Sequence, residues 1–99
     1  MIDTPSTLFP PALRQGWQDR RLTTHERYAL GVLWQHLSAQ DWRPMKSEAF
    51  ARLIDVRREN AARILRRLVE TGYLVMTQPH PREPRLFLLV NHVPAERVA

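Results

Sequence analysis

The 99-residue sequence has no cysteine, only three glycines and a single lysine. Without cysteine it can form neither a disulfide scaffold nor a thiolate-ligated zinc or iron–sulfur site, and the composition fits a reducing cytoplasm. The scarcity of glycine leaves no glycine-rich loop to hold a phosphate. No apolar run approaches the roughly 20 residues of a membrane span. The start MIDTPSTLFPP also lacks the basic and apolar blocks of a signal peptide. We therefore expect a small cytoplasmic protein with no membrane partner.

The charge balance is the most informative feature of the composition. Fifteen basic residues against ten acidic ones give a net charge of +5, and fourteen of the fifteen are arginine. Arginine carries a planar, permanently charged fork that suits phosphates and guanine edges. Nucleic acid is therefore the partner that we expect first. The alternative is that the positive charge serves only to keep a globular domain soluble. An apolar content of 43% is enough for one core.

We interpret residues 1–21 as an N-terminal arm. They hold three of the eight prolines and no sustained periodicity, and a short helix is expected over 12–19 after a Pro-Pro pair. Four apolar side chains of the arm are expected to cover a surface of the same chain or of a second copy: Leu8, Phe9, Leu13 and Trp17.

The following segment alternates helix signals with breaks. The run TTHE over 23–26 has the form of a capping box, and an apolar stripe then continues to about residue 39. Pro44 favours one short edge strand before the next helix. Ser47 is the expected N-cap of that helix, which runs to about Ile54. Its inward-facing residues are expected to be Phe50, Leu53 and Ile54.

The last structured segment is expected to be a helix followed by a β-hairpin. The helix covers 58–71 and ends at Gly72, and its apolar residues fall within one arc of roughly 100°. Strands over 73–78 and 85–90 flank a proline-rich loop over 79–84. The pattern predicts an α+β domain over 22–91 with three core helices and a C-terminal hairpin, and a flexible tail over 92–99.

Basic and polar residues concentrate on the outward face of the 58–71 helix, where the side chains of arginine and asparagine can contact guanine and adenine edges. The alternative is an ordinary solvated helix face. The residues expected to contact DNA there are Arg57, Arg58, Glu59, Asn60, Ala62, Arg63, Arg66 and Arg67. The hairpin loop adds His80, Arg82 and Arg85, and residues near the start of the 47–54 helix add Arg43, Lys46 and Ser47 for a phosphate.

The sequence offers no signal for catalysis or metal binding. The four histidines have no ligand spacing, and His25-Glu26 is not followed by the second histidine of a zinc hydrolase motif. We expect no enzymatic activity, no metal, no cofactor and no small-molecule ligand.

The helical pair and the residues that follow resemble the winged helix-turn-helix family over residues 22–91. The run ARLIDVRR over 51–58 is similar to that family's A-x-x-L-G-V-S-R turn, with Asp55 in place of the usual glycine and Arg57 in place of the serine cap. LRRLVETGYL over 65–74 is similar to the family's exit into the wing. The resemblance implies a three-helix core with a β-hairpin wing, and a recognition helix over 58–71 in the major groove of duplex DNA.

Four features of the layout are an apolar arm, the helix start LTxxE over 22–26, the Asp41-Trp42 loop and the ending FLLVN over 87–91. In these the chain is similar, within that family, to the N-terminal domain of phage replication protein O and related replication initiators. Such initiators carry a further partner-binding region, and the end of this sequence at residue 99 favours a small regulator or an isolated DNA-binding domain. We expect a small transcriptional regulator associated with the nucleoid. The alternatives are an origin-binding initiator domain and a winged-helix module that binds another protein. Because one hairpin face is left apolar beyond the core, we also expect a homodimer.

Overall fold

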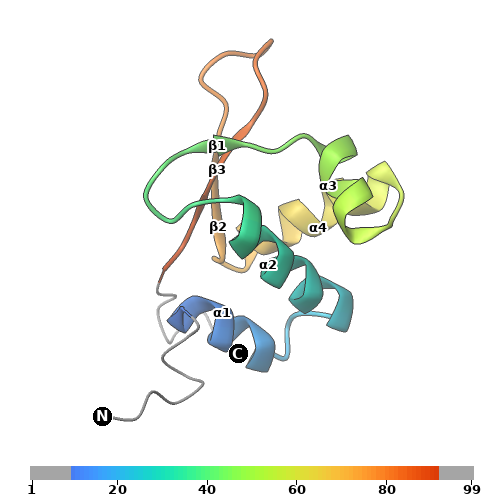
Figure 1. The fold of residues 1–99 in the computed structure, drawn as a ribbon, viewed down its shortest axis with the longest axis vertical. Helices are drawn as coiled ribbons and strands as arrows, with labels where there is room; N and C mark the ends of the chain where they lie inside the picture. Colours follow the sequence, from blue (N-terminus) through green and yellow to red (C-terminus); the bar gives the residue numbers. More distant parts are fainter. Residues whose placement is uncertain (1–9, 92–99) are drawn as a thin grey trace.

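The computed structural model describes residues 10–91, which contain four helices and a three-stranded antiparallel sheet (Figure 1). In chain order these are α1 (Pro11–Gln18), α2 (Thr24–His36), β1 (Arg43–Pro44), α3 (Ser47–Ile54), α4 (Arg58–Glu70), β2 (Leu74–Thr77) and β3 (Leu86–Leu89). No helix in this part of the chain is long and apolar enough to cross a membrane. The α+β class is confirmed.

Helix α2 begins as the sequence predicts. The Thr23 hydroxyl accepts a hydrogen bond from the Glu26 amide at 3.1 Å, and the Glu26 carboxylate accepts one from the Thr23 amide at 3.0 Å. These reciprocal bonds satisfy two amides that have no partner within the helix. The helix ends at His36, three residues before the expected end at Ala39.

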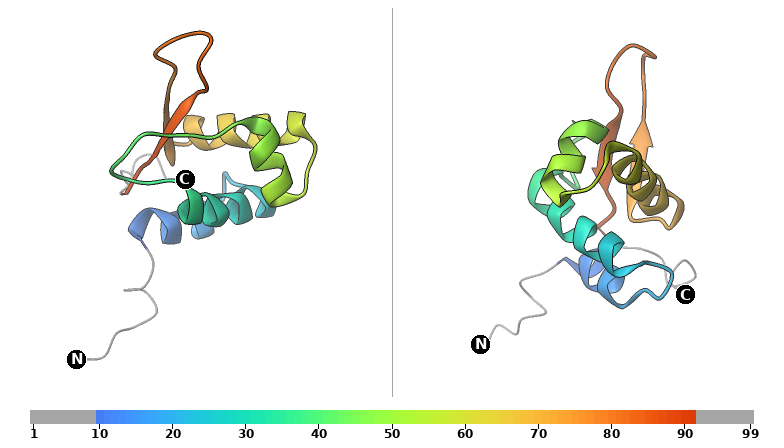
Figure 2. Two further views of the ribbon diagram at one scale, coloured as in Figure 1. Left: turned by 45° about the horizontal axis from the view of Figure 1, so that its top comes forward. Right: turned by 90° about the vertical axis from the view of Figure 1, so that its right-hand side faces the viewer.

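The turn between α3 and α4 depends on one residue in the left-handed region. Asp55 has φ 56° and ψ 55°, and the Val56 amide donates to the Ala51 carbonyl at 3.0 Å. The chain therefore leaves α3 and re-enters a helix within residues 55–57, and α3 packs across α4 (Figure 2). Aspartate tolerates this geometry without glycine, as predicted.

A glycine ends α4 and directs the chain into the sheet. Gly72 has φ 93°, the Tyr73 amide donates to Leu68 at 2.9 Å, and the Gly72 amide donates to Val69 at 3.1 Å. This pair of bonds is a Schellman motif, which requires a positive φ at Gly72. The predicted helix end is confirmed.

The sheet has the order β1-β3-β2, so the C-terminal strand lies in its centre. Leu74 pairs with Leu89 and Thr77 pairs with Leu86, which is the register expected for a hairpin closed by residues 79–84. The loop of this hairpin projects from one end of the molecule, and α1 lies at the other end (Figure 1). The short edge strand at Pro44 is also confirmed.

Helix α1 belongs to the same core as the later helices. Ala12 and Leu13 are buried, and a Cβ on Gly16 would overlap the Leu30 side chain, so α1 and α2 approach closely at this point. The Ala12 amide also donates to the Asn91 carbonyl at 3.3 Å. The short helix expected in the arm is therefore present, shifted by one residue. The proposed division into 1–21, 22–91 and 92–99 stays a prediction.

Two details of α3 were predicted wrongly. Lys46 is the N-cap and Ser47 is the first helical residue, with no side-chain hydrogen bond to a backbone amide. Leu53 was expected to face inward, but 38% of it is exposed, because the core contacts of this short helix are made by Phe50, Ala51 and Ile54. An eight-residue helix has too few turns for sequence spacing to fix the width of its buried face.

A buried carboxylate links the start of the chain to the sheet. Asp19 is fully buried and accepts hydrogen bonds from the Arg21 guanidinium, the closest at 2.7 Å, and from the Tyr73 hydroxyl at 2.7 Å. Arg21 also donates to the Thr71 carbonyl at 3.3 Å, and Arg27 donates to the Asp19 carbonyl at 2.8 Å. The α1–α2 connection is thus bonded to α2, to the end of α4 and to the start of β2.

Burial and hydrogen bonding together shift the pKa values of Asp19 and Tyr73 in opposite directions. Burial alone would raise the pKa of Asp19, but the bonds from Arg21 and Tyr73 outweigh it and hold this pKa below its ordinary value of 3.8. Burial, and then the bond to Asp19, raises the pKa of Tyr73 well above its ordinary value of 10.0.

These shifts predict how stability depends on pH. The contribution of Asp19 to the free energy of unfolding is complete above pH 3.8 and is lost as the pH falls through the lower pKa of the folded chain. The contribution of Tyr73 is complete below pH 10.0 and is lost as the pH rises through the higher pKa of the folded chain. Denaturant unfolding across the pH range, with the parent chain and Asp19→Asn, measures both limbs. We expect the stability difference between the two chains to be largest at neutral pH and to shrink below pH 3.8. A difference that is constant with pH would contradict the assigned network.

Candidate nucleic-acid interface

The outward face of α4 is exposed along its whole length. Ala61, Ile64, Leu65 and Leu68 are buried, as the predicted apolar arc requires. Arg57, Arg58, Glu59, Asn60, Arg63 and Arg66 are exposed on the remaining surface and at the N-cap, and Ala62 is half-buried. Helix α4 therefore presents a continuous polar surface rich in arginine.

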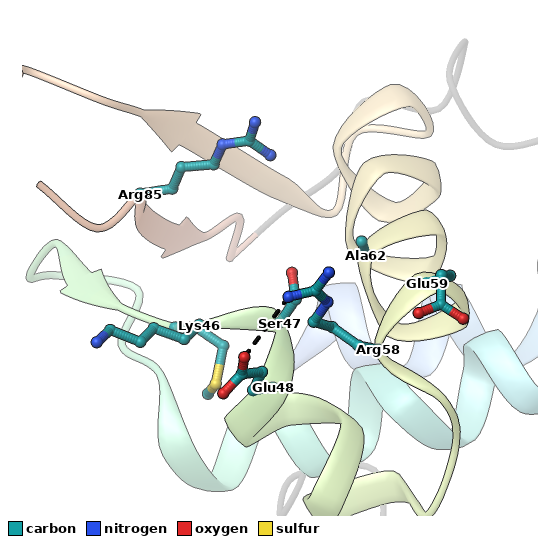
Figure 3. A pocket seen from close by; sticks show the side chains of 8 residues that line it. Lys46, Ser47, Glu48, Arg58, Glu59, Ala62 and Arg85 are labelled. Carbon is teal, nitrogen blue, oxygen red and sulfur yellow. Dashed lines mark ion pairs between the residues drawn. The ribbon is translucent and has the colours of Figure 1, made fainter. Parts of the chain in front are cut away.

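Three segments that are separate in the sequence meet at one groove of about 580 Å³ (Figure 3). Lys46 and Ser47 come from the start of α3, Arg58 and Ala62 come from α4, and Arg85 immediately precedes β3. In Figure 3 the Lys46 side chain extends away from Arg58, so Arg58 and Arg85 are the cations nearest the α4 side of the groove. The groove thus combines residues that the sequence analysis assigned separately to the 58–71 helix, to the hairpin and to a phosphate site at the start of α3.

The groove continues along α4 toward the sheet. A neighbouring hollow of about 300 Å³ shares Met45, Ser47, Ala62 and Arg85 with the first and adds Arg66. Its remaining lining is apolar: Leu65, Val69, Met76 and Phe87. Arginines from both α4 and the hairpin therefore border a concave surface with an apolar floor.

Two of the cations on α4 are restrained by neighbours. Arg58 lies 3.5 Å from the Glu48 carboxylate, and Arg63 donates to the Asn60 side-chain oxygen at 3.4 Å. Both contacts are exposed, so water screens them and they contribute little to stability. They can be exchanged for contacts to a ligand at small cost.

The tip of the hairpin is an ordered turn. Glu83 donates its amide to the His80 carbonyl at 3.0 Å, and the Gln78 side chain donates to the carbonyls of Pro81 and Glu83. His80 and Arg82 are exposed here and do not line the groove beside α4. Arg43, in β1, is also exposed. The hairpin therefore offers two separate cationic positions, one at its tip and one at Arg85.

Arg67 differs from the other arginines of α4. Its guanidinium donates to the Arg21 carbonyl at 2.9 Å and lies 3.7 Å from the Glu26 carboxylate and 3.8 Å from that of Glu70. The first two contacts join α4 to the N-terminus of α2, and the third lies within α4. Its predicted role in DNA binding is untested, and the structure adds an internal role.

The sequence analysis predicted neither the internal role of Arg67 nor the hydrogen-bond network around Asp19. The only available signal was a group of charged residues around the start of α2, and nothing in the sequence indicated that Asp19 and Tyr73, 54 positions apart, would meet. Of the arm residues, Leu13 is buried and Trp17 is 41% exposed, while Leu8 and Phe9 lie outside the described residues. Residues 10–91 contain no group of three histidine, aspartate or glutamate side chains placed to hold a metal ion.

Helix-turn-helix α3–α4, followed by a hairpin and completed by an edge strand before α3, defines the winged helix-turn-helix fold. Solved structures with this arrangement resemble the chain over most of its length. A structure of a Rep–DNA complex has a TM-score of 0.67 at 14% identity, covering 99% of this chain and 89% of that one. The N-terminal domain of a DNA-binding protein has a TM-score of 0.66 at 14% identity, covering 98% and 88%.

A third similar structure is MepR, a transcription regulator of the Staphylococcus aureus multidrug efflux pump MepA. It has a TM-score of 0.54 at 18% identity, covering 89% of this chain and 67% of that one. No family model matches the sequence, and no curated protein matches it. At these identities the likenesses establish the fold, and the predicted winged helix is confirmed.

Stability measurements can test whether Arg67 holds the core together while its neighbour Arg66, on the exposed face, does not. Arg67→Ala should lower the unfolding free energy by about 1–2 kcal/mol, because it removes the hydrogen bond to Arg21 and the ion pair to Glu26 that hold α4 against the start of α2, together with an ion pair to Glu70 within α4. Arg66→Ala, the matched control on the exposed face, should change it by less than about 0.5 kcal/mol. Chemical denaturation at neutral pH measures both. Equal effects of the two substitutions would contradict the structural role of Arg67.

Proposed function

We propose that the chain binds duplex DNA, with α4 in the major groove and the hairpin as a wing along the phosphate backbone. The observation that carries this proposal is a concave surface of two adjoining hollows beside an exposed helix, in which Arg58 lines the first hollow, Arg66 the second, and Arg85 both. Arg58 and Arg66 are contributed by the helix and Arg85 by the wing. A helix of this diameter fits the major groove of B-DNA, and cations on its flanks then lie near phosphates.

The individual roles follow from the chemistry of each side chain. Asn60 and Arg63 lie in the first two turns of α4, and we assign them to adenine and guanine edges. Arg66 is assigned to phosphate, together with the wing residues His80, Arg82 and Arg85. Arg43, Lys46 and Ser47 are assigned to a further phosphate beside the start of α3. Neighbours described as a Rep–DNA complex and a DNA-binding protein support this proposal.

We propose transcription regulation as the biological role, with replication initiation as the alternative. The likeness to the transcription regulator MepR supports the first. The higher TM-score of the Rep–DNA complex, and its coverage of nearly the whole of both chains, supports the second. Selecting bound sequences from a random duplex pool would reveal the motif, and mapping that motif to promoters or to an origin would discriminate the two roles.

A module that binds an acidic protein is the competing function. It would use the same fold, but it has no need for arginines on both α4 and the wing. Binding to DNA releases counterions, so affinity must fall steeply with salt. We also propose a non-enzymatic role for the chain, which is supported by neighbours described as a DNA-binding protein and a transcription regulator.

The wing provides the decisive experiment. Affinity for random duplex DNA should fall with salt, and the slope of log affinity against log salt should flatten by about 0.9 for each phosphate contact that is lost. We expect this flattening in Arg82→Ala and Arg85→Ala. Arg20→Ala is the control, because it removes the same charge after α1, away from the wing. Salt-insensitive or absent binding by the parent chain would refute the proposed function.

We also propose a homodimer that uses the sheet face away from the helices. Val75 is 43% exposed on β2, and Leu86, Leu88 and Val90 remain half-buried beside it. Helix α1 lies against this sheet near Tyr73, which is fully buried. A two-fold dimer would bind half-sites about one helical turn apart.

Light scattering tests the dimer directly. At tens of micromolar, the parent chain should have twice the chain mass of 11.7 kDa, and Val75→Glu should return it to the monomer. Thr24→Glu, an exposed change on α2, is the control. A parent chain that is monomeric both alone and on DNA would rule the dimer out.

A further inference from the structure

Glu59 lies among cations on the surface that the proposed function assigns to DNA. It occupies the first turn of α4, is exposed, and lines the groove together with Arg58, Ala62 and Arg85 (Figure 3). By helical spacing it stands opposite the buried arc, one turn before Arg63. Its carboxylate therefore belongs to the centre of the outward face.

The cations nearest to Glu59 in the sequence are engaged with other partners. Arg58 pairs with Glu48 at 3.5 Å, and Arg63, at the favourable i+4 position, donates to Asn60 at 3.4 Å instead. Within residues 10–91, no ion pair or side-chain hydrogen bond involves the Glu59 carboxylate. Its oxygen atoms are thus available as acceptors.

An available carboxylate is a disadvantage on a surface that only attracts phosphates. It repels the DNA backbone, and this repulsion is not compensated on an arbitrary sequence. A carboxylate in the first turn of a helix is stabilised by the helix dipole. An acid elsewhere in the first turn of α4 would gain the same stabilisation without facing the DNA. Its location at the centre of the outward face needs a compensating donor on the DNA.

We propose that Glu59 is a specificity residue, which accepts a hydrogen bond from the exocyclic amino group of cytosine in the major groove. This inference rests on the proposed binding of duplex DNA. Among the base edges of the major groove, the cytosine amino group is a donor without an adjacent acceptor, which matches a carboxylate. At guanine or thymine the same carboxylate faces acceptors, and at adenine it faces an amino group flanked by the N7 acceptor, so binding is weaker than at cytosine.

The neighbouring residues extend the inference to the composition of the site. Asn60 and Arg63 suit adenine and guanine, so one half-site should combine a guanine, an adenine and a cytosine within the reach of the first two helical turns. A surface without Glu59 would bind more tightly but with less discrimination.

Selection from a random duplex pool, followed by titration of the selected and the random duplex, tests the role of Glu59. The parent motif should contain one position at which cytosine is preferred about tenfold. Glu59→Ala should lose this preference and bind random duplex about threefold to tenfold more tightly. Glu59→Gln keeps a carbonyl acceptor and adds a donor, so its preference should shift toward adenine.

Glu70→Gln is the matched control, because Glu70 is an exposed carboxylate at the far end of the same helix. It should leave the motif unchanged. Thermal unfolding of each variant separates recognition from an effect on the helix terminus. If Glu59→Ala lowers the stability but leaves the motif unaltered, the inference is overturned.

A parent motif without a cytosine preference would also overturn the inference. Salt-dependent binding of random duplex would then still support the proposed function. If the parent chain does not bind duplex DNA at low salt, both proposals fail.

Discussion

The buried carboxylate of Asp19 is the interaction on which the relative placement of α1, α2, α4 and the sheet depends. A charged group can be buried only if hydrogen bonds replace its water, and here Arg21 and Tyr73 supply them at 2.7 Å. Because Arg21 also bonds to the end of α4 and accepts a hydrogen bond from Arg67 at its carbonyl, the network extends into the helix that carries the proposed interface. The side of α4 facing α2 is thus tied to the core, while the other side is left to solvent.

This difference between the two sides of α4 explains how one helix can be both a core element and the proposed binding surface. Arg67 holds α4 against the start of α2, and the arginines on the wing side have only weak, exposed partners. Their charges are therefore available at low cost to an anionic ligand. The wing brings Arg85 to the same groove, so helix and hairpin act on one surface (Figure 3).

The elements that could be predicted are those with a local physical cause. The capping box at Thr23, the left-handed position at Asp55 and the positive φ at Gly72 each depend on a few neighbouring residues. The errors at Ser47 and Leu53 arose where a short helix gave too little periodicity. A serine at a helix start can serve as cap or first residue, and here Lys46 takes the cap position.

By itself, the sequence determined the helices, the hairpin register, the fold class and the side of α4 that faces outward, because each follows from spacing along one segment. Only the tertiary structure decided which charges remain available for binding. Asp19 and Tyr73 are 54 residues apart, and Arg67 and Arg21 are 46 apart, so their contacts require folded elements to bring them together. The groove has the same origin: Ser47, Arg58 and Arg85 meet because α3, α4 and the sheet pack on a common core. Periodicity gives the direction of a side chain but not the partner within its reach.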